Sequence, residues 1–380
     1  MKIVDLKVNY LEVPLSEPIR TATGKALSWL QRDSISFTLV KVFTDEGIVG
    51  VGAQDVHYPD WGKYIEKSMK PILVNQIIEP YFIEKLARIL RARPRARAPC
   101  AIEMALWDAV GKKAGLPVYK LLGAYQEKVK AMASVLEPYP LWGAEQWTKF
   151  FESLLNYGFK GVKLHIGFDW PDPKDVIDVV EAIRNGLGYD FSLMVDVVKA
   201  WRETPFYNLR TAIKFAKELE KYDVEWLEEP LPHFNNPDLC AQLCNATNTP
   251  IAGGGGMFGI HTYKTILEKG ALDIVEPAVM HTGLSEVRRI ALLAELYGRE
   301  CVPQFNGVGI GMAATLHVIG STNIQWLEYP YHPPALTPEA RDCMLSEPIK
   351  IDKDGFVEVP KKPGLGIELN EDIIKKYTIK

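Results

Sequence analysis

The 380-residue sequence has few cysteines, no long apolar run and no strong excess of charge of either sign. Its five cysteines are scattered and odd in number, which argues against the disulfide framework of a secreted protein. No apolar run approaches the ~18 residues that a membrane-spanning helix needs. The N-terminus alternates like a β-strand and lacks the apolar block of a signal peptide. These absences predict a cytoplasmic protein that does not enter a membrane.

The composition is that of an ordinary globular protein. Hydrophobic residues make up 47% of the chain and charged residues 24%, and the formal net charge is -4. This charge gives no general attraction to nucleic acid. The one charge run is the arginine cluster of residues 91–97, which is short, lacks interleaved aromatic residues and is interpreted as a solvated loop. We therefore expect no nucleic-acid partner.

The first 125 residues predict an α+β domain. Residues 1–13 alternate in polarity, and residues 34–52 read as two strands around the turn signal Asp45-Glu46-Gly47. The segment 100–115 then carries apolar residues at helical spacing and ends at Gly115. We assign residues 1–125 to one N-terminal domain.

From about residue 128, short apolar runs alternate with amphipathic helical segments. The eight runs are VKAMASV, GVKLHIG, FSLMVDVV, VEWLEEPL, TPIAGGG, LDIVEPAV, ECVPQF and IQWLEYP. Each but the last is followed by a helical segment, which is typical of a β/α barrel. We assign residues 126–335 to a modified β/α barrel and 336–380 to a C-terminal segment that returns to the N-terminal domain.

Polar side chains gather at the ends of these predicted strands, where β/α barrels carry their catalytic groups. In chain order, the strand-end residues are Lys163 with His165, Asp196, Glu228 with Glu229, Gly255, Ala278, Gln304 and Glu328. Four of the eight strands thus end in titratable groups, which are rarely buried without partners. The pattern predicts an active site at the barrel mouth.

The sequence resembles the enolase superfamily, specifically its mandelate racemase/muconate-lactonizing branch. The resemblance covers nearly the whole length, and its most specific stretches are 101–123, WLEEPLP (226–232), GFKGVKLHIG (158–167) and PGLGIEL (363–369). It implies an α/β protein: a (β/α)7β TIM-like barrel with an α+β capping domain formed by the N-terminal region and the C-terminal tail. It also implies abstraction of the proton α to a carboxylate, Mg²⁺ as cofactor, and a homo-oligomer, either a dimer or an octamer.

Taken residue by residue, the resemblance implies an incomplete metal site. Asp196 and Glu228 match the first two ligands, but the third ligand position is Gly255, which is not a ligand. Mg²⁺ prefers several oxygen ligands, so its affinity should fall. Two interpretations stay open. Asp196 and Glu228 hold Mg²⁺ with additional waters, or they are inherited carboxylates now held by salt bridges to Lys163 or similar cations.

The proton-handling positions are altered as well. The family's Lys-x-Lys pair appears as Lys163 and His165, which share a strand face and are expected to be catalytic. An imidazole has an unperturbed pKa near ~6.5, and a neighbouring ammonium favours its neutral, proton-accepting form. The alternative is a structural role, in which His165 is a buried histidine that hydrogen-bonds to a neighbouring group. The Asp–His dyad expected on the opposite face is replaced by Ala278 and Gln304.

Five residues are predicted to bind the substrate. Glu328 matches the family's acidic residue that hydrogen-bonds the substrate carboxylate. The others, chosen by position at the mouth or in cap loops, are Gln304, Arg20, His57 and Tyr58. This set fits a small, polyhydroxylated carboxylate.

With proton-handling residues expected on one face only, a two-base racemase is disfavoured. A dehydration can run on one face, because His165 can remove the α-proton and return it to a departing β-hydroxyl. We therefore expect a sugar-acid dehydratase, a carbon–oxygen lyase. The alternative is a catalytically divergent or non-catalytic small-acid-binding homologue that has lost Mg²⁺ dependence, since the metal supplies much of the enolate stabilisation.

Overall fold

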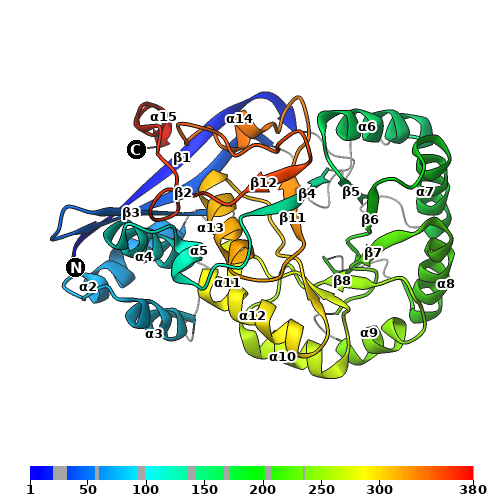
Figure 1. Ribbon diagram of the computed structural model, residues 1–380, viewed down its shortest axis with the longest axis horizontal. Helices are drawn as coiled ribbons and strands as arrows, with labels where there is room; N and C mark the ends of the chain where they lie inside the picture. The colour runs from blue at the N-terminus through cyan, green and yellow to red at the C-terminus, as the bar shows by residue number, and fades with distance from the viewer. Residues whose placement is uncertain are drawn as a thin grey trace.

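The computed structural model describes residues 1–19, 32–55, 60–91, 99–135, 142–166, 172–201, 207–233 and 236–379. It is a mixed α/β structure with an antiparallel sheet beside a curled parallel sheet, and helices cover the outside of the latter (Figure 1). The predicted fold class is confirmed. Every helix in the described part of the chain is too short or too polar to cross a membrane.

The N-terminal domain is built on a four-stranded antiparallel sheet of order β13-β1-β2-β3. Its strands are β1 (Ile3–Ile19), β2 (Arg32–Thr44), β3 (Val49–Asp55) and β13 (Thr378–Ile379). The β2–β3 turn falls at Asp45-Glu46-Gly47, where Gly47 adopts a φ of 76° that favours glycine. Strand β13 pairs with β1 at Leu11 and Thr378, so the C-terminus returns to the N-terminal sheet.

Helices cover this sheet, and one of them lies directly on β3. They are α1 (Asp60–Tyr64), the π-helical turn η2 (Ile65–Met69), α2 (Lys70–Leu73), α3 (Pro80–Arg91), α4 (Pro99–Ala114) and α5 (Val118–Leu121). A Cβ on Gly50 would lie 2.0 Å from the carbonyl oxygen of Ala105, and one on Gly52 equally close to that of Ala101. The two glycines therefore permit the close approach of α4 to the sheet.

The parallel sheet contains all eight strands that the sequence predicts. They are β4 (Lys128–Ser134), β5 (Gly161–His165), β6 (Ser192–Asp196), β7 (Val224–Glu228), β8 (Ile251–Gly253), β9 (Ile274–Val275), β10 (Glu300–Cys301) and β11 (Trp326–Pro330). Their order is β10-β9-β8-β7-β6-β5-β4-β11, so all their C-terminal ends share one edge, the barrel mouth. Strand β12 (Phe356–Glu358) pairs antiparallel with β4.

Helices alternate with these strands. They are α6 (Ala144–Tyr157), α7 (Pro173–Leu187), η3 (Lys199–Trp201), α8 (Leu209–Leu219), η4 (Glu220–Tyr222), α9 (Pro237–Cys244), α10 (Ile260–Lys269), α11 (Val279–Thr282), α12 (Leu284–Leu296) and α13 (Gly309–Gly320), while α14 (Pro338–Arg341) and α15 (Glu371–Tyr377) follow the last strand. Helix α13 is buried along its whole length, as its nearly uninterrupted apolar sequence requires. It contacts α5, α12, β3 and β4 and so joins the barrel to the N-terminal domain.

A layer of apolar side chains fills the barrel beneath the mouth. It consists of Met132, Met194, Trp226, Ala252, Ile274, Val302 and Trp326. On β5 this layer has Gly161, where a Cβ would lie 2.9 Å from the Trp326 ring. Side chains alternate along a strand, so the residue two positions later also faces the interior, one layer nearer the mouth. This second layer contains Ser134, Lys163, Asp196, Glu228, Glu276, Gln304 and Glu328.

A buried histidine in α13 makes the stability of the fold depend on pH. Nδ1 of His317 accepts a hydrogen bond of 3.1 Å from the backbone N–H of Tyr119 in α5. Burial lowers the pKa of His317 from 6.5 to about 4. The unfolded chain therefore binds more protons below pH 6.5 than the folded one. The neutral, buried imidazole of His317 therefore contributes fully to the stability of the fold above that pH, and this contribution is lost as the pH falls toward 4.

We predict that replacing His317→Gln reduces the acid sensitivity of folding. Between pH 7 and pH 5, the variant should lose about 2 kcal/mol less of its unfolding free energy than the unmodified protein does. Urea denaturation at the two pH values measures this difference. The exposed His261, replaced in the same way, is the control. An equal loss in the unmodified protein and the His317→Gln variant would contradict the assignment.

Candidate active site

The second layer is centred on an ammonium group that bridges two carboxylates. Nζ of Lys163 lies 3.0 Å from Oε2 of Glu228 and 2.8 Å from Oε1 of Glu328. All three side chains are buried. Burial opposes the charged form of Lys163, but the nearby carboxylates outweigh it and hold the pKa of the ammonium well above its usual value. Lys163 is therefore a permanent cation at the centre of the mouth.

The two carboxylates are also fixed by other protein groups. Trp226 donates from Nε1 to Oε2 of Glu228 at 3.2 Å. Glu328 accepts at Oε1 from Oγ of Ser134 and at Oε2 from the backbone N–H of Phe305, each at 2.7 Å. These contacts fix Glu328 at the mouth, and its contact with the substrate carboxylate stays a prediction.

His165 and Asp196 form a second pair at the mouth. Nε2 of His165 lies 3.3 Å from Oδ2 of Asp196, and Oδ1 of Asp196 accepts from the backbone N–H of Val198 at 2.9 Å. Burial, reinforced by the charge of Lys163, lowers the pKa of His165 to about 4, and burial raises the pKa of Asp196 to about 6. The His165 side chain is 16% exposed, against 2% for Lys163, so the imidazole lies nearer the opening.

Glu276 is a further titratable group that the sequence analysis missed. The sequence predicts Ala278 at the end of the sixth strand, but β9 ends at Val275. Ile274 belongs to the apolar layer, so Glu276 faces the same interior. Strand β9 lies four places from β5 in the eight-strand order, which puts Glu276 across the mouth from Lys163. Burial, followed by the charge of nearby carboxylates, raises the pKa of Glu276 well above its usual value.

The expected third metal ligand is replaced by a packed pair, Gly255 and Gln304. A Cβ on Gly255 would lie 2.1 Å from Oε1 and 2.4 Å from Cδ of Gln304. Gly254 has a φ of 105°, which favours glycine. Gly255 does not have a positive φ, so the backbone of Gly255 permits a side chain. The Gln304 carboxamide therefore fills the volume into which a third ligand would extend. Nδ1 of His281 lies 3.2 Å from the carbonyl oxygen of Gly255.

The donor set does not fit the metal site that the family resemblance implies. Both carboxylate oxygens of Glu228 contact Lys163, and Asp196 faces His165. The third position is Gly255. Among the residues that the structure describes, no three His, Cys, Asp or Glu side chains are grouped so as to hold a metal ion. These contacts favour the second interpretation, in which the carboxylates are held by protein cations.

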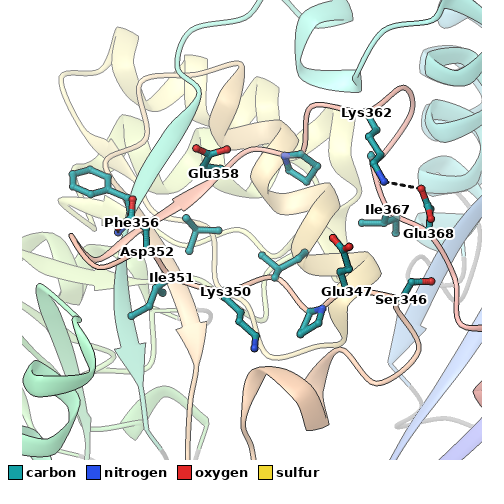
Figure 2. A pocket seen from close by; sticks show the side chains of 15 residues that line it. Ser346, Glu347, Lys350, Ile351, Asp352, Phe356, Glu358, Lys362, Ile367 and Glu368 are labelled. Atoms are coloured by element: carbon teal, nitrogen blue, oxygen red, sulfur yellow. Dashed lines mark hydrogen bonds and ion pairs between the residues drawn. The ribbon is translucent and has the colours of Figure 1, made fainter.

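The three remaining predicted substrate contacts, Arg20, His57 and Tyr58, lie outside the described residues. A cavity of about 430 Å³ lies in the C-terminal segment, lined by residues between 346 and 368. Figure 2 shows its side chains, including the ion pair of Lys362 with Glu368. Strand β12, which contributes to its wall, pairs with Lys128–Lys130 at the end of β4 away from the mouth. This cavity is separate from the candidate active site.

Comparison with known proteins places the chain in a family. Residues 5–123 match the mandelate racemase/muconate lactonizing enzyme N-terminal domain, and residues 146–373 match the enolase C-terminal domain-like family. An arabinonate dehydratase from Saccharolobus solfataricus is 30% identical over 371 residues, which cover 93% of this chain and 94% of the relative. The N-succinyl-L-Arg/Lys racemase of Bacillus cereus is 28% identical, over 100% and 98% of the two chains.

Solved structures agree with these matches. The L-talarate dehydratase from Polaromonas sp. JS666, complexed with Mg and L-glucarate, superposes with a TM-score of 0.84 at 26% identity and covers 100% of this chain and 98% of its own. Relatives of this chain thus include sugar-acid dehydratases and racemases, and a magnesium-bound structure is among them. The resemblance stated from the sequence is confirmed: the chain belongs to the mandelate racemase/muconate-lactonizing branch of the enolase superfamily.

Proposed function

We propose that this chain is a sugar-acid dehydratase, a lyase that removes water from a small polyhydroxylated carboxylate. One observation carries the proposal: His165 and Lys163 project from the same face of β5, with Nε2 of His165 3.3 Å from Asp196. This arrangement supplies a base, a group that orients it and a fixed cation. The sugar-acid dehydratases among the relatives support the same reaction class.

The proposed reaction uses His165 twice. The neutral imidazole takes the proton α to the substrate carboxylate, and Asp196 stabilises the imidazolium that forms. The Lys163 ammonium, on the same face of β5, is the protein cation that we assign to offset the negative charge of the enolate. The imidazolium then gives its proton to the β-hydroxyl, the C–O bond breaks and water leaves. The enol that remains tautomerises to a 2-keto acid, so atoms and charges balance.

A reversible racemase is less compatible with this site. Racemisation in both directions needs a base on each face of the α-carbon in turn. Ala278 has no titratable group, and Gln304 carries a neutral amide. Glu276 lies across the mouth, and burial raises the pKa of its carboxyl group, which disfavours its resting state as a base. Dehydration requires only the His165 face.

The contacts to the substrate stay proposals. We assign Gln304 and Glu328 at the mouth to substrate binding, together with the cap residues Arg20, His57 and Tyr58. A homo-oligomer, dimer or octamer, is likewise part of the proposal and follows from the family alone.

We predict that the protein converts at least one aldonate or related sugar acid to a 2-keto acid, and that His165→Asn lowers kcat/KM by about 10²–10⁴-fold. Semicarbazone formation across a panel of acid sugars measures the product. The matched control is His261→Asn on the surface of α10. Turnover unaffected by His165→Asn would contradict the assignment of His165 as the catalytic base. Binding of sugar acids without any turnover would favour the alternative, a non-catalytic acid-binding homologue.

A second prediction concerns stereochemistry. In D₂O, substrate recovered before completion should carry deuterium at the α-carbon with its configuration retained, because His165 both removes and returns the proton on one face. Proton NMR of the recovered substrate measures exchange and configuration together. Accumulation of the epimer would instead show proton donation from the other face, and loss of that epimer in Glu276→Gln would identify the donor.

A further inference from the structure

We propose that the barrel mouth of this protein works without a divalent cation. The Lys163 ammonium is its fixed positive charge, and the Gln304 carboxamide takes the place of the third metal ligand. The inference goes beyond the proposed dehydration and does not rest on it, because cation binding is measured without turnover. It sets this chain apart from the talarate dehydratase structure complexed with Mg.

A protein cation already occupies one side of Glu228. Lys163 contacts Glu228 through both carboxylate oxygens, at 3.0 and 3.1 Å, and Glu328 at 2.8 Å. A divalent cation beside Glu228 would enter next to this buried ammonium and be repelled by it. Three carboxylate ligands offset such a repulsion, but Gly255 removes one of them. Lys163 already offsets part of the charge of Glu228 and Glu328, so Glu228 is held by a protein cation and is a weaker ligand.

Gln304 also packs against Gly255, where the third metal ligand is expected. Gln304 follows β10 and Gly255 follows β8, and β9 lies between these strands. The Gln304 carboxamide nevertheless reaches Gly255, because a Cβ on that glycine would lie 2.1 Å from its Oε1 oxygen. A metal site that had only lost its third ligand would leave the space of that side chain empty. Here the side chain of Gln304 fills the space beside Gly255, so these two positions are packed together.

Asp196, the other expected metal ligand, already contacts protein groups. Asp196 orients His165 through its Oδ2 oxygen, while its Oδ1 oxygen accepts from the backbone N–H of Val198. Both oxygens thus have protein partners. A cation bound to Asp196 would compete with these two contacts.

The test is a titration of metal-stripped full-length protein with Mg²⁺ and Mn²⁺, by calorimetry and by Mn²⁺ electron paramagnetic resonance. We expect no saturable binding up to about 10 mM of either ion. Three variants complete the experiment: Gly255→Asp, Gln304→Ala and the two combined. The double variant should bind Mn²⁺ at least about tenfold more tightly than Gly255→Asp, because the new carboxylate enters the volume that Gln304 otherwise fills. Gln304→Ala alone, which opens the volume without adding a ligand, is the matched control.

Two results of the binding titrations would overturn the inference. One is saturable Mg²⁺ binding by the unmodified protein below about 1 mM, which would mean that another group completes the site. The other is a double variant that binds no more tightly than Gly255→Asp, which would remove Gln304 as the obstacle. The proposed function is tested separately. Turnover abolished by a chelator and restored by Mg²⁺ would refute the metal-free site and leave the dehydratase assignment standing.

Discussion

The ion pairs of Lys163 with Glu228 and Glu328 are the interaction on which the barrel mouth depends. They join β5, β7 and β11, which lie far apart in the sequence, above an apolar layer that includes Trp226 and Trp326. A buried charge without its partner costs about 3–5 kcal/mol, so each member of the group fixes the others in one geometry. The same cation reinforces the effect of burial in lowering the pKa of His165, and it opposes the effect of burial on the pKa of Glu276.

Much of the fold was predictable because its signals are local. The eight strand segments, the turn at Asp45-Glu46-Gly47 and the helix that became α4 each have a periodicity or a turn signal of their own. Lys163, His165, Asp196, Glu228 and Glu328 followed from the rule that barrel strands carry functional groups at their C-terminal ends.

Other features of the site have no local signal. Glu276 was missed because β9 is only two residues long and the proline after it shifted the predicted strand end. The alternation from Ile274 would have revealed it. The contact of Gln304 with Gly255 joins segments about 50 residues apart, and no pattern within either segment predicts it. Family membership fixes the fold and the place of the site, whereas the chemistry depends on these individual replacements.

The central claim is that the mouth is organised around a protein cation and excludes a divalent metal. Its most direct test is a crystal structure of the protein grown with excess Mn²⁺, with anomalous diffraction data that locate the metal. The account predicts no anomalous peak at the mouth, with Nζ of Lys163 between Glu228 and Glu328. An ordered Mn²⁺ coordinated by Asp196 and Glu228 would contradict it.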